Sequence, residues 1–153
     1  MITLNLPRET SAKITEALKR AGRREVGGVL MAEHIGPNEF EIRELTVHNI
    51  GAFATFVRRI EDALGRLRSF FERVQHDYSR FNYIGEWHSH PSFTPEPSSR
   101  DDESMRQIVQ DPQVGANFVV LVIVKLDAEE QLIATAHTYL TDGTKHRSTV
   151  RML

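Results

Sequence analysis

Residues 118–124 read FVVLVIV, a continuous apolar run rich in β-branched side chains. A run of this kind predicts a strand that is buried on both faces, as in the centre of a sheet that helices cover. We therefore expect residues 118–124 to form the central strand of the fold.

Helical and strand patterns alternate irregularly around this run. Helices show apolar side chains every three or four residues, and the stripe in residues 59–76 is the stronger of the first two. Strands show shorter apolar or alternating runs. The predicted helices cover residues 8–21, 59–76 and 100–110, the predicted strands cover residues 26–32, 39–47, 83–88, 118–124 and 131–140 with a short last strand, and a proline-rich loop covers residues 91–99. This order predicts an α+β fold, a mixed central sheet flanked by helices, in a single domain spanning residues 1–153.

The composition excludes several classes of function. The 153 residues carry a net charge of only -2 and no cysteine. The lack of cysteine excludes disulfides, thiolate zinc fingers and cysteine nucleophiles. The sequence contains no long run of like charge, so its charge pattern does not predict a nucleic-acid or membrane partner. No secretion signal begins the sequence, and no apolar run approaches the roughly 20 residues that span a bilayer, so we expect a cytoplasmic protein.

A cluster of metal-ligating side chains follows the predicted strand over residues 83–88. The sequence from His88 to Asp101 has the form H-x-H-P-x6-S-x-x-D, in which Ser98 supplies the serine. Two histidines that are two residues apart in an extended segment project to the same side. Two imidazoles and one carboxylate leave one position of a tetrahedral zinc ion open, as in catalytic zinc sites. The motif therefore predicts a catalytic site with one Zn²⁺, held by His88, His90 and Asp101.

Such a site also needs a general base near the attacking water, and spacing alone does not identify it. Glu25 directly precedes a strand that contains Gly27 and Gly28, where another backbone can come close. Glu86 is two residues before His88 and can share its face. The candidates are Glu25, Glu33, Glu41, Glu44, Glu86 and Glu96.

Glu25 with Val26-Gly27-Gly28, followed by the motif from His88 to Asp101, resembles the JAMM (JAB/MPN-type) metalloprotease family. The resemblance implies a cytidine-deaminase-like α/β/α sandwich, with His88, His90 and Asp101 as zinc ligands. It further implies Glu25 as the catalytic base and Ser98 as the catalytic residue that helps to hold the water or stabilises the oxyanion. The pair Ser99 and Asp102 gives the same S-x-x-D one residue later, but the family spacing selects Ser98 and Asp101.

The segment from Tyr83 to Pro91 is most similar to small prokaryotic members of that family, which resemble deubiquitinases. The implied reaction is zinc-dependent hydrolysis of the peptide or isopeptide amide after the C-terminus of a ubiquitin-like modifier. The implied partners are that modifier or its conjugates, with activating-like and conjugating-like enzymes of the same pathway.

Two other functions remain open at the level of sequence. One is a peptidase that processes a sulfur-carrier protein or a modifier precursor. The other is a DNA-associated protein similar to the RadC family, whose motif H-x-H-P-S-x4-P-S-x-x-D is also present between His88 and Asp101. The Glu25-Val26-Gly27-Gly28 element and the lack of a basic face favour the amidase over the DNA-associated protein.

Overall fold

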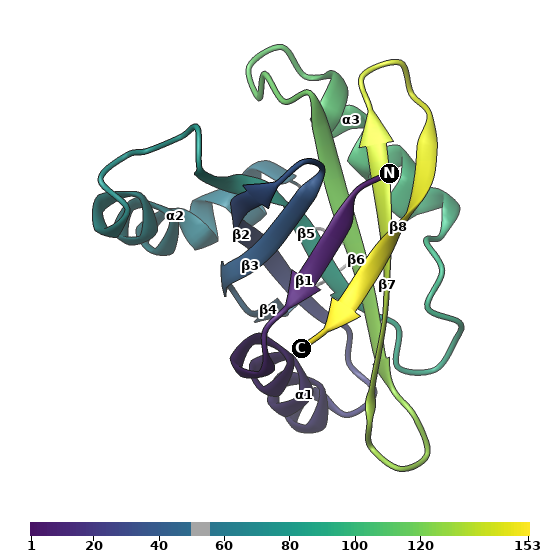
Figure 1. Cartoon of the computed structure of the whole chain (residues 1–153). Coiled ribbons are helices and arrows are strands. Elements are labelled where there is room, and N and C mark those ends of the chain that lie inside the picture. The colour runs from purple at the N-terminus through teal and green to yellow at the C-terminus, as the bar shows by residue number, and fades with distance from the viewer. Residues whose placement is uncertain (50–55) are drawn as a thin grey trace.

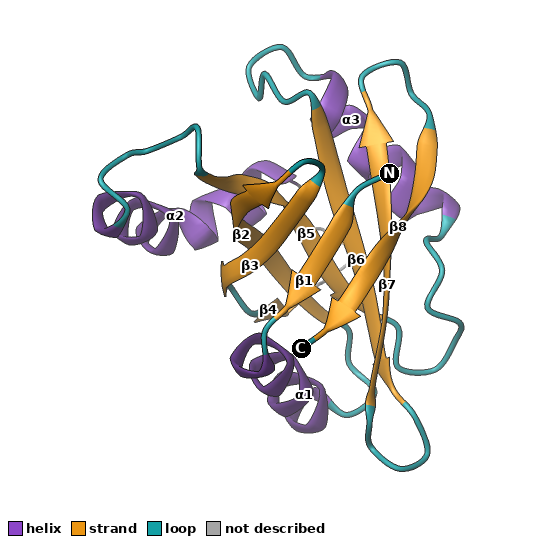
Figure 2. Cartoon of the chain, in the orientation of Figure 1, coloured by secondary structure: helices purple, strands orange, loops and turns teal. Residues whose placement is uncertain are grey.

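A computed structural model describes residues 1–49 and 56–153, with the side chains of residues 56–62 left undescribed. Eight strands and three helices make up this part of the chain (Figures 1 and 2). The strands are β1 Thr3–Leu6, β2 Val26–Gly36, β3 Glu39–Leu45, β4 His48–Asn49, β5 Phe81–Ser89, β6 Phe118–Leu126, β7 Leu132–Leu140 and β8 Lys145–Met152, and the helices are α1 Arg8–Ala21, α2 Phe56–Arg73 and α3 Ser99–Gln110.

The strands form one mixed sheet that closes on itself. Their order is β3-β1-β8-β7-β6-β5-β2-β4, and β3 pairs with β2 as well as with β1. Strand β1 is parallel to both β3 and β8, and β5 is parallel to β6, whereas the other pairs are antiparallel. Strand β6 is apolar on both faces and lies between β5 and β7, as its sequence predicts.

The three helices pack on two different sides of this sheet. The stripe of Ile14 and Leu18 in α1 belongs to the largest core cluster, together with Trp87 of β5 and Val122 of β6. Helix α2 packs with Leu67 and Phe70 against β2, and α3 packs against β6 and β7. Figure 1 shows α2 and α3 outside the ring of strands, with α1 directly after β1. Because Trp87 is fully buried in the inner core, it is a packing residue.

The sequence predictions are confirmed for the helices and for the longer strands. The predicted helices over residues 8–21, 59–76 and 100–110 correspond to α1, α2 and α3. The mixed sheet flanked by helices is also confirmed. The α/β/α sandwich is not confirmed, because the sheet closes through β3 and α1 packs into the inner core.

Two strands are absent from the predictions, and both are defined by their partners. Strand β1 alternates polar and apolar residues, but it has only four residues before Pro7, too few for this pattern to stand out in the local sequence. It forms because its backbone pairs with β3 and β8, whose residues are far away in the sequence. Strand β4 has only two residues, which pair with Val26 and Gly27 of β2.

A β-bulge in β5 sets the direction of the side chains near its end. Leu30 of β2 pairs with Gly85, but Met31 pairs with Tyr83, so Ile84 is an extra residue on β5. An extra residue shifts the alternation of side chains by one. Ile84 and Trp87 consequently both face the inner core. Glu86 and His88 are turned to the outer face, the face that α2 and α3 cover.

Gly85 makes this bulge possible. Its φ is 153°, and a Cβ at this position would lie 1.8 Å from the carbonyl oxygen of Val120 on the neighbouring strand. Neither backbone can move without breaking the parallel pairing of β5 with β6. Only glycine therefore fits at this point of the sheet.

Among the described helices, even the longest lacks the apolar stretch that a membrane crossing requires.

We predict that Gly85→Ala lowers the free energy of unfolding by roughly 3 kcal/mol, because the added methyl group overlaps the β6 backbone. Urea denaturation followed by circular dichroism measures the loss. Gly65→Ala in α2 is the control: its methyl group meets no atom within 4 Å, and in a helix it should stabilise by up to about 1 kcal/mol. Equal stability of Gly85→Ala and the wild type would contradict the close contact between residue 85 and the β6 backbone.

Candidate metal centre

The end of β5 brings two histidines to one place. His88 is the second-last residue of β5, and His90 follows the strand, with its backbone N–H donating to the carbonyl oxygen of Val124 at 2.9 Å. This bond continues the pairing with β6 for one more residue. Both imidazoles are buried, with 8% and 4% of their surface exposed. The extended backbone therefore keeps both rings on the same side.

Asp101 reaches these rings from the first turn of α3. Its Oδ1 lies 3.3 Å from Nδ1 of His88, and its Oδ2 lies 3.3 Å from Nε2 of His90. Ser98 is the N-cap of α3: its Oγ accepts from the backbone N–H of Asp101, and its own N–H donates to Asp101 Oδ2 at 2.9 Å. This reciprocal capping box fixes the carboxylate at the helix start. Asp101 thus caps α3 and bridges the two imidazoles.

The neighbouring carboxylate of Asp102 points elsewhere. The hydroxyl of Tyr139 donates to Asp102 Oδ1 at 2.6 Å, and Lys145 Nζ lies 3.1 Å from both carboxylate oxygens. Asp102 is thereby directed to β7 and β8. Of the two S-x-x-D pairs, only Ser98 and Asp101 therefore place their aspartate against His88 and His90.

The loop between His90 and α3 is attached to the sheet at several points. Thr135 of β7 donates its hydroxyl to the carbonyl oxygen of Pro95 at 2.5 Å, and Lys125 of β6 donates to that of Phe93 at 3.2 Å. His90 Nδ1 lies 3.0 Å from the carbonyl oxygen of Thr94, which orients the ring so that Nε2 faces Asp101. The first two contacts join β6 and β7 to the loop. No local sequence pattern identifies these two, because their partners are distant in the chain.

Glu25 lies beside the histidines, although it is far from them in the sequence. It directly precedes β2, whose first residue, Val26, donates its N–H to the Ser89 hydroxyl at 2.9 Å. Ser89 stands between the two histidines, and Gly27 pairs with His88. The Glu25 side chain is exposed, and its charge is one of the groups that raise the pKa of His90. Glu25 is therefore an exposed carboxylate whose backbone lies next to the end of β5.

The other candidate bases have different partners. Glu33 binds Arg43 and Arg80 at the far end of β2, and Glu41 binds Arg43. The rest are paired as well: Glu44 with Arg66 and Arg73, and Glu96 with Arg147. Ion pairs thus hold these four carboxylates away from the two histidines.

Glu86 is the exception, because it contacts the cluster directly. It is fully buried, and its Oε2 lies 3.0 Å from Nε2 of His88. The bulge at Gly85 places both side chains on the outer face, so their spacing of two residues brings them together. Glu86 therefore orients the His88 ring with Nδ1 toward Asp101. This buried carboxylate thus orients the His88 imidazole and does not face solvent.

The contacts within the cluster shift the pKa values of its members. Burial lowers the pKa of His88, but the hydrogen bonds with Asp101 and Glu86 outweigh it and raise this pKa to about 9. Burial likewise lowers the pKa of His90, and contacts with Asp101 and the Thr94 carbonyl outweigh it and raise the pKa. For Asp101, burial raises the pKa, but both histidines hold it well below its usual range. The carboxylate and the imidazoles are thus stabilised as ion pairs.

The donor set of this cluster fits a divalent metal in kind. Two imidazoles and one carboxylate are ordinary zinc ligands. In the described part of the chain, no three or more His, Cys, Asp or Glu side chains already stand around a point that could hold an ion. Asp101 instead contacts both imidazoles directly. Metal binding would therefore separate groups that are paired here.

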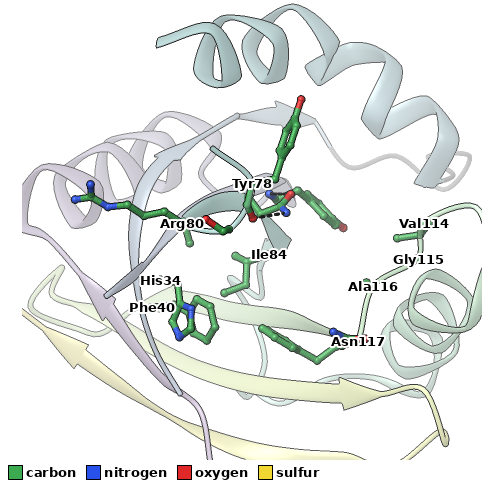
Figure 3. Close-up of a pocket in the computed structure, with 14 residues that line it drawn as sticks. His34, Phe40, Tyr78, Arg80, Ile84, Val114, Gly115, Ala116 and Asn117 are labelled. Atoms are coloured by element: carbon green, nitrogen blue, oxygen red, sulfur yellow. Dashed lines mark hydrogen bonds between the residues drawn. The ribbon is translucent and has the colours of Figure 1, made fainter. Parts of the chain in front are cut away.

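A separate cavity of about 410 Å³ lies at the opposite end of β5 (Figure 3). Some of its lining side chains already have partners: His34 stacks on Phe40 with ring centroids 4.7 Å apart, and Arg80 binds Glu33 outside the cavity. It is lined by Asn82 and Ile84 at the start of β5, whereas His88 is at the strand end. The cavity therefore lies apart from the candidate metal centre.

The fold is shared with a solved structure of very different sequence. The solution structure of protein DSY2949 from Desulfitobacterium hafniense superposes with a TM-score of 0.70 at 14% identity, covering 98% of this chain and 92% of that one. The crystal structure of AF2198, a JAB1/MPN domain protein from Archaeoglobus fulgidus, has a TM-score of 0.47 at 18% identity, covering 97% and 98% of the two chains. None of the curated proteins matches the chain.

The sequence itself matches a family model over most of its length. The model describes prokaryotic homologs of the JAB domain, and it matches residues 7–138. This range includes Glu25, both histidines and Asp101. The chain belongs to the family of prokaryotic homologs of the JAB domain.

Proposed function

We propose that this protein is a zinc-dependent hydrolase that cleaves the peptide or isopeptide amide after the C-terminus of a ubiquitin-like modifier. The observation that carries the proposal is the meeting of His88, His90 and Asp101 beside Glu25. Family membership supports a hydrolase of the JAB type. The ubiquitin-like substrate, and activating-like and conjugating-like enzymes as partners, rest on the resemblance of the segment from Tyr83 to Pro91.

His88, His90 and Asp101 would hold the zinc ion. Two neutral imidazoles and one carboxylate leave the site with a net charge of +1 and one open position. When bound, zinc supplies a Lewis acid that polarises the scissile carbonyl and lowers the pKa of water toward about 7. Glu86 supports this set by holding the His88 ring in place.

Glu25 is suited to proton transfer by its exposure and position. A general base must reach the attacking water. Glu86 is less suited to this role, because its carboxylate is fully buried and already contacts His88. Glu25 would accept a proton from the water and return it to the amine that leaves. The bond between the Val26 N–H and Ser89 holds the backbone next to Glu25 against the end of β5.

Ser98 would stabilise the negative charge that develops on the carbonyl oxygen. Its Oγ accepts from the Asp101 N–H with one of its two lone pairs, and its hydroxyl hydrogen can still be donated. The side chain is exposed at the start of α3. The same residue would thus cap the helix and donate to the oxyanion. No covalent intermediate is required, consistent with a chain that has no cysteine.

The linkage that is cleaved separates an isopeptidase from a precursor peptidase. Both use the same water and the same residues, but only the former accepts an amide on a lysine side chain. The assay compares a Lys-linked fusion and a linear fusion of one ubiquitin-like modifier. Cleavage of the linear fusion alone would replace the isopeptidase by a processing peptidase.

We predict that Glu25→Gln lowers kcat at least about 100-fold while zinc remains bound, because the amide cannot accept a proton and is not a ligand. Cleavage of the modifier fusion and zinc content by metal analysis measure the two effects. Glu129→Gln, in the exposed turn after β6, is the control and should keep full activity. A fully active Glu25→Gln variant would remove Glu25 from the mechanism.

We predict that Asp101→Asn weakens zinc binding more than Asp102→Asn does. Loss of a supporting group alone commonly costs about 10–100-fold in metal affinity, and loss of a ligand should cost at least as much. In Asp102→Asn the side-chain amide oxygen can still accept from the Tyr139 hydroxyl, so the control substitution keeps the fold intact. Competition with a chromophoric chelator measures both affinities. A larger loss of zinc affinity in Asp102→Asn would show that Asp101 is not the carboxylate that binds the metal.

A further inference from the structure

A groove of about 340 Å³ lies between α1 and the start of β2, beside Glu25. Its floor is apolar: Val26 and Leu45 are buried core residues, whereas Val47 is 48% exposed. Ala17 of α1 also lines it. An apolar floor open to solvent is suited to an apolar side chain of another molecule.

The rims of this groove carry mostly positive charge. Four cations line it against one carboxylate, Glu16: they are Lys13, Arg20, Arg24 and Arg66. Arg20 pairs with Glu16 at 2.6 Å, and Arg66 lies 3.6 Å from Glu44. Because the whole chain has a net charge of -2, this positive charge is a local feature and not part of a basic surface.

Arg24 is held in place at the groove by the backbone. Its Nε donates to the carbonyl oxygen of Ala21 at 3.3 Å, and its Nη2 donates to that of Arg20 at 3.4 Å. These carbonyls lie at the C-terminal end of α1, where a cation is favourable. Both acceptors are neutral, so the charge of the guanidinium is still available to a ligand.

The groove meets the candidate metal centre only along the backbone. Arg24 and Val26 line the groove, and Glu25 lies between them in the chain. The Val26 N–H is bonded to Ser89, which stands between the two histidines. A segment bound in the groove would therefore lie near the backbone of Glu25.

We propose that this groove binds an acidic segment of the protein substrate, an apolar side chain flanked by Asp or Glu, next to the amide that is cleaved. The apolar side chain occupies the floor over Val26 and Val47, and its acidic neighbours face Lys13 and Arg24. Complementary charge of this kind selects and orients a partner. The inference rests on the proposed function for its substrate, but binding itself needs neither metal nor hydrolysis.

The test measures binding of two labelled peptides to the metal-free protein by fluorescence anisotropy. One peptide is Glu-Asp-Leu-Leu-Asp-Glu, and the other is its uncharged counterpart Gln-Asn-Leu-Leu-Asn-Gln. We expect the acidic peptide to bind more tightly, and its Kd to rise about tenfold in Lys13→Glu with Arg24→Gln. Lys19→Glu is the matched control, since Lys19 lies on α1 outside the groove and faces Glu130; it should leave Kd unchanged.

Three results would overturn the proposal. They are equal binding of the two peptides, an equal loss in Lys19→Glu, and tighter binding of a 20-base-pair duplex DNA that the groove variant abolishes. Circular dichroism of each variant separates loss of the groove from loss of fold. Peptide binding without cleavage of any modifier fusion would support the groove proposal and reject the proposed hydrolase. Cleavage without peptide binding would support the hydrolase and reject the groove proposal.

Discussion

The pairing of β2 with β5 is the constraint on which the rest of this structure depends. On its other side β2 pairs with β3, and β3 continues to β1, so this pairing closes the sheet. The same pairing sets Gly27 opposite His88 and lets Val26 bond to Ser89. It is reinforced at Gly28, where a Cβ would overlap the Thr46 carbonyl oxygen that accepts from the Trp87 indole. The strand pairing that closes the sheet is thus also the pairing that brings the site residues together.

The bulge at Gly85 decides which side chains of β5 face the inner core and which face the cluster. In a regular strand, Ile84, Glu86 and His88 would share one face, and Trp87 would lie on the other. The extra residue reverses this, so the indole enters the core and His88 meets Glu86 and Asp101 on the outer face. Asp101 has two structural roles in the cluster, and the loop before it has partners on two strands. Asp101 caps α3 and contacts both histidines, and the loop before it is fastened by residues of β6 and β7.

Much of the fold could be predicted from local sequence, and the failures have a common cause. Helices α1, α2 and α3 carry a stripe of apolar residues within one segment, and β6 is apolar throughout, so each is visible without its partners. Strand β1 and the closure through β3 are not visible in this way. The alternation in β1 is only four residues long, so this strand depends on two distant strands that supply its hydrogen-bond partners.

By itself, the sequence determined the residue types and spacing of the candidate centre: two histidines on one side of an extended segment, and an aspartate near the start of a predicted helix. Spacing alone left six glutamates as candidate bases, and only the family resemblance favoured Asp101 over Asp102. The tertiary structure separated them, since ion pairs with arginines hold Glu33, Glu41, Glu44 and Glu96 elsewhere. It also turned Asp102 to Tyr139 and, through the bond between the Val26 N–H and Ser89, brought the backbone of Glu25 to the end of β5. The physical reason is that side-chain partners are set by strand register, and register between segments distant in the chain is a property of the folded sheet.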